Sequence, residues 1–142
     1  MHLNVVRLHP LAKLPCYAHP EDAGLDLFAI EPTCLAPGES KLIKTGIAVA
    51  LPPGTEAQVR PRSGLALHHA ITVLNTPGTI DAGYRGEVGV ILINQGQQPF
   101  EVTLGMKIAQ MVIAPVLRVQ IHEVEALGAS PRGGGGFGST GQ

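Results

Sequence analysis

The sequence predicts an all-β fold, an antiparallel sandwich or barrel, and the spacing of its turn residues and apolar runs supports this class. The chain contains 18 glycines and 12 prolines, about a fifth of its residues against roughly 12% in average proteins. These residues separate short apolar runs, many rich in valine and isoleucine, whose length and β-branched content favour strands over helices. The runs do not alternate with helix-length segments as in a Rossmann-like fold, so antiparallel pairing is expected.

The expected strands are eight runs, at residues 3–8, 25–30, 42–51, 57–61, 71–74, 87–94, 108–113 and 116–124. In the last run, Leu117, Val119 and Ile121 alternate with polar residues, which predicts a strand with one solvated face. The run 88–93 is apolar on both faces except at Gly89, so it lies between layers or against another subunit. An ordinary core strand explains that run equally well.

The length and the 44% hydrophobic content suit one domain with a sizeable core. We expect residues 1–127 to form this β domain. From residue 128 onward the chain is rich in glycine and cannot bury enough apolar surface to fold alone. Residues 128–142 are therefore expected to form a flexible C-terminal arm.

Composition excludes several function classes. The net charge of −1 gives no electrostatic basis for binding nucleic acid or anionic lipid. The chain has neither a signal-peptide core nor an apolar span of about 20 residues, so a cytoplasmic protein is expected. Cys16 and Cys34 form no CxxC pair and favour reduced thiols, although a disulfide stays open. The histidines show no zinc-binding pattern.

The segment Pro-Arg-Ser-Gly-Leu-Ala at 61–66 is a candidate phosphate site. It follows a strand whose polar residues share one face with Arg62. A short helix capped by Ser63 would bring a guanidinium, a hydroxyl and free amide donors together. A capped turn with a solvated arginine would fit the same residues.

Two further segments could carry chemistry. Residues 75–84 form a turn-rich connection with Asp81 beside Tyr84, as in a hairpin that offers backbone groups to a planar ligand. An Asx turn and an aromatic at the core edge would fit that segment too. The tail places Arg132 and Phe137 among glycines that allow close approach to a ligand, but it lacks the ending of a P-loop. A terminus without function would have the same composition.

Together these segments resemble the trimeric dUTPase family, whose five motifs occur here in order. The motifs are Ala-Gly-Leu-Asp-Leu at 23–27, the segment 61–66, Gly-Thr-Ile-Asp-Ala-Gly-Tyr-Arg-Gly at 78–86, Gly-Met-Lys-Ile-Ala-Gln at 105–110, and the arm from 132 to 141. The third is the most specific, and five matches in order make a strong signal.

The resemblance implies a jelly-roll-like (β-clip) fold and a homotrimer. Its three active sites lie at subunit contacts, each completed by the C-terminal arm of a neighbouring chain. The implied activity is Mg²⁺-dependent hydrolysis of dUTP to dUMP and pyrophosphate. This reaction limits uracil incorporation into DNA and supplies dUMP for dTMP synthesis.

Residue roles follow from the same resemblance. Asp81 activates the water that attacks the α-phosphate, and Asp26 binds Mg²⁺ through water. Tyr84 lies under the deoxyribose. The phosphates are assigned to Arg62, Ser63, Gly64 and Gln110, the last on a face shared with Ile108 and Val112. The uracil edge is assigned to Asn75, Thr79, Ile80 and Gly89. The arm contributes Arg132, Phe137, Gly138, Ser139 and Thr140, with Phe137 stacked on the uracil.

The sequence departs from the family pattern at Met106 and Lys107, where a polar pair such as Asp-Arg is usual, and at Ala70, where glycine is usual. Neither departure is expected to touch the chemistry. A dCTP deaminase shares this fold but needs a catalytic glutamate, whereas the third motif here carries Asp81. The sequence is also compatible with a non-catalytic nucleotide-binding relative and with a plain jelly-roll interaction domain.

Overall fold

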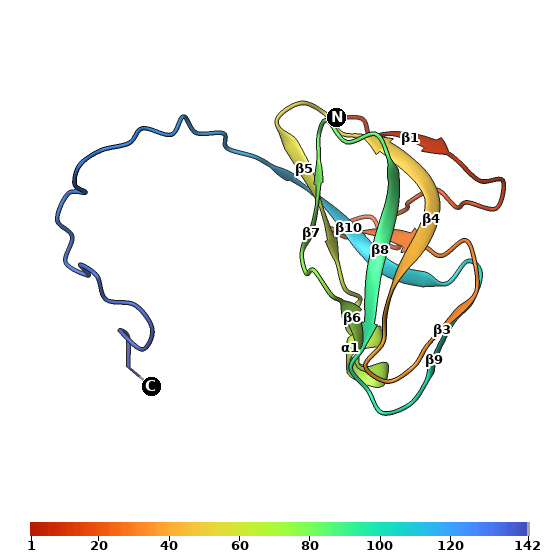
Figure 1. The fold of residues 1–142 in the computed structure, drawn as a ribbon. Helices are drawn as coiled ribbons and strands as arrows, with labels where there is room; N and C mark the ends of the chain where they lie inside the picture. Colours follow the sequence, from red (N-terminus) through yellow and green to blue (C-terminus); the bar gives the residue numbers. More distant parts are fainter. Residues whose placement is uncertain (142) are drawn as a thin grey trace.

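The computed structural model describes residues 1–141, which form two four-stranded sheets, one two-stranded sheet and one short helix (Figure 1). The elements in chain order are β1 (Asn4–Arg7), β2 (Leu25–Phe28), β3 (Thr33–Leu35), β4 (Ser40–Ala50), β5 (Thr55–Arg60), α1 (Ser63–His69), β6 (Ile71–Val73), β7 (Gly78–Asp81), β8 (Glu87–Asn94), β9 (Phe100–Val102) and β10 (Lys107–Pro115). The all-β prediction is confirmed.

Every strand pairing is antiparallel. One sheet has the order β1-β4-β8-β6, the second β2-β10-β5-β7, and β3 pairs with β9. Both four-stranded sheets contribute to one hydrophobic core, for example through Ile43 and Val90 from the first and Val59 and Met111 from the second. Alternation along β5 shows the cause, because Thr55, Ala57 and Val59 are buried while Glu56, Gln58 and Arg60 face outward.

Strand β8 has the two apolar faces that the sequence predicted, but they differ in burial. Val88, Val90 and Leu92 are buried in the core, whereas Gly89, Ile91 and Ile93 on the outward face are only half-buried. The protomer therefore leaves an apolar sheet face partly open to solvent.

The predicted connection at 75–84 joins β6 and β8. These two strands pair with each other, since Ile71 lies opposite Asn94 and Val73 opposite Leu92. Within this connection, β7 pairs with β5 of the second sheet. The connection therefore bridges the two sheets. The short strands β3, β7 and β9 were not among the expected runs.

The expected strand at 116–124 is wrong for the protomer. Strand β10 ends at Pro115, and residues 116–124 form neither strand nor helix. Leu117, Val119 and Ile121 are 94%, 82% and 95% exposed, so neither side of this segment is covered. Figure 1 shows the chain leaving the barrel after β10 and running away from it. Alternation indicated an extended segment, but no strand among residues 1–141 pairs with it.

Both cysteines carry free thiols, with Cys16 exposed and Cys34 half-buried. A hydrogen bond with Glu101, the residue opposite it on β9, raises the pKa of the Cys34 thiol. Across residues 1–141, no helix is long and apolar enough to span a membrane.

Candidate functional site

Three elements bring the predicted phosphate-binding residues together. Strand β10 lies between β2 and β5, and Gln110 is opposite both Asp26 on β2 and Arg60 on β5. The chain leaving β5 then places Arg62 and Ser63 at the start of α1. These side chains surround a cleft of about 300 Å³, which is lined by Ala18, His19, Asp22, Ala23, Gly24, Asp26, Arg62, Ser63, Gly64, Lys107 and Gln110.

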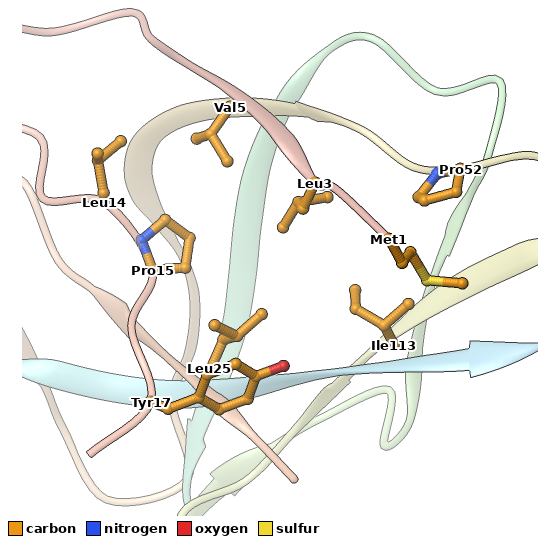
Figure 2. Close-up of a pocket in the computed structure, with 9 residues that line it drawn as sticks. All are labelled: Met1, Leu3, Val5, Leu14, Pro15, Tyr17, Leu25, Pro52 and Ile113. Carbon is orange, nitrogen blue, oxygen red and sulfur yellow. The ribbon is translucent and has the colours of Figure 1, made fainter. Parts of the chain in front are cut away.

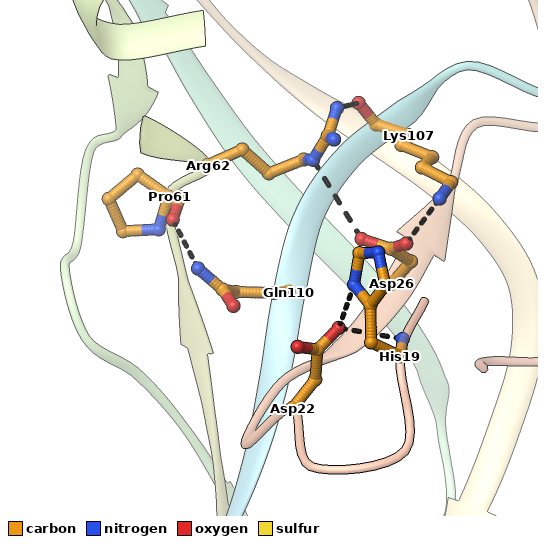
Figure 3. Close-up of polar contacts among 7 residues, drawn as sticks. All are labelled: His19, Asp22, Asp26, Pro61, Arg62, Lys107 and Gln110. Carbon is orange, nitrogen blue, oxygen red and sulfur yellow. Dashed lines mark hydrogen bonds and ion pairs between the residues drawn. The ribbon is translucent and has the colours of Figure 1, made fainter. Parts of the chain in front are cut away.

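Asp26 is the buried carboxylate of this cleft, and two cations lie beside it (Figure 3). Lys107 Nζ is 2.6 Å from Oδ2, and Arg62 Nε is 3.8 Å from Oδ1. Oδ2 receives no well-directed hydrogen bond from residues 1–141, so its contact with Lys107 is an ion pair. A buried carboxylate is costly unless charge compensates it, and here both cations supply that charge.

Arg62 and Gln110 are held by backbone carbonyls. Arg62 Nη1 donates to the Lys107 carbonyl at 3.1 Å, and Gln110 Nε2 donates to the Pro61 carbonyl at 3.0 Å. A side chain at Gly24 would place its Cβ 2.2 Å from Gln110 Oε1, so glycine leaves the space that the amide occupies. The Gln110 amide oxygen lies against Gly24 in the cleft lining, while its nitrogen donates to Pro61.

The predicted cap of the short helix is wrong. Ser63 is the first residue of α1, and the extended residue Arg62 occupies the N-cap position without a side-chain cap bond. The first amide of this turn with a helical partner belongs to Ala66, which donates to the Arg62 carbonyl. Amides of a first turn lack such partners, and both Ser63 and Gly64 line the cleft.

Lys107 contradicts the expectation that the departures in the fourth motif do not touch the site. Strict alternation would place Lys107 and Gln110 on opposite faces of β10. A β-bulge between Lys107 and Ala109 inserts one extra residue, so Lys107 joins the face of Gln110 and Asp26. The bulge also moves Ile108 into the core, so Gln110 shares its outward face with Val112 but not with Ile108.

The rim of the cleft adds two residues that the sequence did not single out. His19 donates its backbone N–H to Asp22 Oδ2 at 2.9 Å, and its Nδ1 lies 3.1 Å from the same oxygen. Both residues line the same cleft as Asp26 (Figure 3). In the sequence, a short turn around an acidic residue could have indicated this pair, but such turns are common in loops.

The predicted nucleoside-binding residues form a second group around β7. Thr79 and Asp81 face outward, while the Ile80 side chain is buried, so only the backbone of Ile80 is available to a ligand. Asn75 Nδ2 would lie 3.3 Å from a Cβ at Gly78, which places its amide against the start of β7. Backbone polar groups and one exposed carboxylate therefore line the connection.

Tyr84 and Gly89 are the remaining predicted nucleoside-binding residues. Tyr84 is 46% exposed, and its hydroxyl donates to the Glu87 carbonyl at 2.9 Å. Gly89 lies on the outward face of β8, where Leu42 covers the place of its absent side chain. This face presents backbone and apolar surface together, as a planar partly polar ligand requires.

One protomer does not bring the two groups together. Asp81 pairs with Glu56, whereas the cleft lies beyond Arg60, four residues further along β5, or about 13 Å of strand. The cleft lining does not include Asp81 or Tyr84.

The arm residues form a third group, apart from both others. Arg132, Phe137, Gly138, Ser139 and Thr140 are exposed, and Phe137 makes no burying contact with residues 1–141. Arg132 Nε donates to the Gly135 carbonyl within a local turn. The last residue of the expected arm, at position 142, lies outside the described residues. The predicted site residues thus form three groups that lie apart in the structure.

Comparison with protein families and curated relatives gives a consistent match. The family model for dUTPase matches residues 11–141. The chain is 66% identical over 141 residues to the deoxyuridine 5'-triphosphate nucleotidohydrolase of Gloeothece citriformis, with 99% of this chain and 97% of the relative covered. It is 61% identical over 140 residues to the protein of that name from Clostridium tetani, with 99% and 97% covered.

Solved structures agree with this comparison. The Staphylococcus bacteriophage 80alpha dUTPase with dUPNHPP superposes with a TM-score of 0.93 at 30% identity, covering 99% of both chains. A dUTPase mutant from the Staphylococcus aureus phage phi11, described with a structural Mg(II) ion, gives a TM-score of 0.83 at 29% identity. That match covers 89% of this chain and 98% of the phage protein.

Proposed function

Because the chain belongs to the dUTPase family it is an enzyme, and we propose that it hydrolyses dUTP to dUMP and pyrophosphate. The observation that carries this proposal is the cleft in which Asp26, Arg62, Ser63 and Gln110 converge from three elements. A guanidinium, a hydroxyl and free amides suit phosphate oxygens. The reaction would limit uracil incorporation into DNA and supply dUMP for dTMP synthesis in the cytoplasm.

We assign the phosphate chain to the cleft, with Arg62, Ser63 and Gly64 on phosphate oxygens. Gln110 would position the α-phosphate or the attacking water through the oxygen that its contact with Pro61 leaves free. The Lys107 ammonium at the same cleft adds positive charge where a polyanion would lie. The strands and the start of α1 hold these charged side chains in place, so they would need little reorganisation when the phosphates bind.

Asp26 fits the role of holding Mg²⁺ through water. Its carboxylate is buried at the cleft, and Oδ2 has an ion-pair partner but no directed donor within residues 1–141. Magnesium prefers oxygen ligands and keeps several of its waters. When bound, the ion would offset the charge of the triphosphate.

The nucleoside is assigned to the β7 group. Asn75 and the backbone at Thr79, Ile80 and Gly89 would bind the uracil edge. Cytosine reverses donor and acceptor on that edge and would leave groups unpaired, and thymine adds a methyl that a tight connection does not accommodate. Tyr84 under the deoxyribose would exclude a 2′-hydroxyl sterically.

Asp81 is assigned as the general base. Its side chain is exposed on β7, and an ionised carboxylate can take a proton from a water within hydrogen-bond reach. The water would attack the α-phosphorus, and pyrophosphate would leave. One carboxylate suffices because no covalent intermediate forms.

Assembly as a homotrimer would unite the three groups of site residues. The outward face of β8 is apolar and only half-buried in the protomer. A separate apolar groove of about 540 Å³ runs along the N-terminal segment, lined by Met1, Leu3, Val5, Leu14, Pro15, Tyr17, Leu25, Pro52 and Ile113 (Figure 2). The segment 116–124 offers exposed apolar residues of matching character. Surfaces of this kind favour subunit contacts.

The C-terminal arm would then complete a neighbouring site. We propose that residues 128–142 act as this arm and residues 1–127 as the β domain. Phe137 would stack on the uracil, and Arg132, Ser139 and Thr140 would contact the phosphates next to the Gly138 backbone. Ordering the glycines costs conformational entropy, so closure depends on bound nucleotide.

The test is pyrophosphate release from dUTP, UTP, dTTP and dCTP, each with Mg²⁺ and with EDTA. Magnesium-dependent release from dUTP alone supports the proposal. Ammonia from dCTP would indicate a deaminase instead. Nucleotide binding without turnover would indicate a binding module, and the absence of both would indicate an interaction domain.

A further inference from the structure

Several hydrogen bonds stabilise the turn after Asp81, and one of them is made by the Tyr84 hydroxyl. The Tyr84 amide donates to the Asp81 carbonyl at 3.0 Å. Arg85 Nη1 donates to the carbonyls of Ala82 and Tyr84 at 2.7 and 2.8 Å. The Tyr84 hydroxyl in turn donates to the Glu87 carbonyl at 2.9 Å. Hydrogen bonds therefore hold the backbone of Tyr84 in the turn, and its hydroxyl ties the ring to the Glu87 carbonyl.

Gly86 provides the space in which this ring lies. A Cβ at Gly86 would be 2.4 Å from Tyr84 Oη, 2.7 Å from Cζ and 3.0 Å from Cε2. The φ angle of Gly86 is not in the left-handed region, so other residues could adopt this backbone conformation. The requirement for glycine at this position is therefore the ring itself. Gly83, three residues earlier, has nothing within 4 Å of the same added atom.

We propose that Gly86 and the Glu87 carbonyl form a seat that fixes the Tyr84 ring, which makes Gly86 a positioning residue for discrimination against the 2′-hydroxyl. The inference rests on the proposed function, because it uses the role assigned to Tyr84. Steric selection against one oxygen atom needs a wall that does not move. A tyrosine that is 46% exposed would otherwise rotate between side-chain conformers.

The seat predicts how an added methyl would act. In Gly86→Ala the methyl occupies the position of the phenol end, so the hydroxyl loses the Glu87 carbonyl and the ring swings outward toward solvent. The sugar pocket then loses its wall. We expect the ratio of kcat/KM for dUTP over UTP to fall at least about tenfold, since a misplacement of about 1 Å can change rates by larger factors.

Matched variants separate this effect from general damage. Gly83→Ala adds the same methyl to the same turn and should leave the dUTP to UTP ratio at the wild-type value. In a Tyr84→Ala background the wall is already absent, so Gly86→Ala should cause no further change in the ratio. An unchanged ratio in Gly86→Ala, or an equal further drop without the tyrosine, would overturn the proposal.

A second measurement does not depend on turnover. The protein has two tyrosines and no tryptophan, so Tyr17→Phe leaves Tyr84 as the sole tyrosine. In that background, Gly86→Ala should lower the anisotropy of Tyr84 emission and raise its quenching by acrylamide, and unchanged values would refute the seat. If the parent protein released no pyrophosphate from dUTP, the proposed function would fail, while this measurement would still decide whether the seat exists.

Discussion

At the scale of single residues, Asp26 shows how charge compensation shapes the cleft. The Asp26 side chain is 11% exposed, and Lys107 and Arg62 contact its two carboxylate oxygens. Lys107 is 39% exposed at its side chain, so solvent weakens but does not remove this ion pair. Removing one partner of a buried pair leaves the other charge uncompensated.

Lys107→Met should therefore lower the free energy of unfolding by about 1–3 kcal/mol. Urea denaturation would measure this. Lys41→Met, which removes an exposed partner of Glu39, is the control and should cost less than about 1 kcal/mol. Adding Asp26→Asn to Lys107→Met should restore most of the loss, because an amide needs no cation. A double variant as unstable as Lys107→Met would contradict this account.

Asp81 gives a second prediction at this scale. Its side chain is exposed and its strand is held by backbone pairing with β5, so Asp81→Asn should fold normally. Loss of a general base should reduce kcat by a factor of about 10²–10⁴. Calorimetric titration with a non-hydrolysable dUTP analogue should still detect binding. Loss of the thermal transition would assign Asp81 to structure, and loss of binding with an intact transition would assign it to nucleotide binding.

At the scale of elements, one carboxylate contributes to the turn between β3 and β4. Glu39 Oε2 accepts the Ala36 amide at 2.9 Å, and Oε1 lies 3.2 Å from Lys41 Nζ. The bond from the Ala36 amide, helped by Lys41, lowers the pKa of Glu39 from its usual value of 4.5. A carboxyl group with a lowered pKa in the folded state stabilises the fold above its unfolded pKa.

The lowered pKa of Glu39 predicts how the stability of Glu39→Gln depends on pH. The variant should melt at a lower temperature than the parent at pH 7. The difference should shrink as the pH falls below 4.5 and through the folded pKa, where the parent loses the same contribution. Differential scanning calorimetry at pH 7, 5 and 3 would measure the gap, with the exposed Glu21→Gln as control. A gap independent of pH would exclude the carboxylate as its source.

At the scale of the whole molecule, the predicted site residues lie apart in the protomer, so the proposed activity requires assembly. The cleft, the β7 group and the arm do not meet in one protomer, and the segment 116–124 lies exposed. The proposed function therefore predicts that catalysis depends on contacts between chains and on closure of the arm.

Truncation before Arg132 tests the arm. Residues 132–141 are exposed and contribute no strand, so the shortened chain should keep its melting temperature and its trimeric mass in light scattering. Turnover of dUTP should fall strongly, because the stacking and phosphate contacts of the arm are lost. Phe137→Ala in the full chain should reproduce part of that loss. Dissociation of the truncated trimer would instead place the arm in the subunit interface.

Much of this protein could be predicted from local sequence. Turn residues between β-branched runs determined the all-β class, and the run at 87–94 matches β8 at both ends. Both features depend on periodicity and on short-range turn chemistry, which neighbouring residues specify. The shared site of Asp26, Arg62 and Gln110 was implied by the resemblance to the dUTPase motifs, and these residues occupy neighbouring strands or their ends.

Other features depend on contacts with backbone that is distant in the sequence, and only the tertiary structure determined them. The bulge in β10 placed Lys107 beside Asp26, and strict alternation would have placed it on the opposite face. The segment 116–124 alternates like a strand but has no partner strand among residues 1–141 of its own chain. The contact of Tyr84 with Gly86 arises from the path of one turn. One extra residue or one missing partner strand changes such outcomes, and neither is encoded in the local pattern of apolar and polar residues.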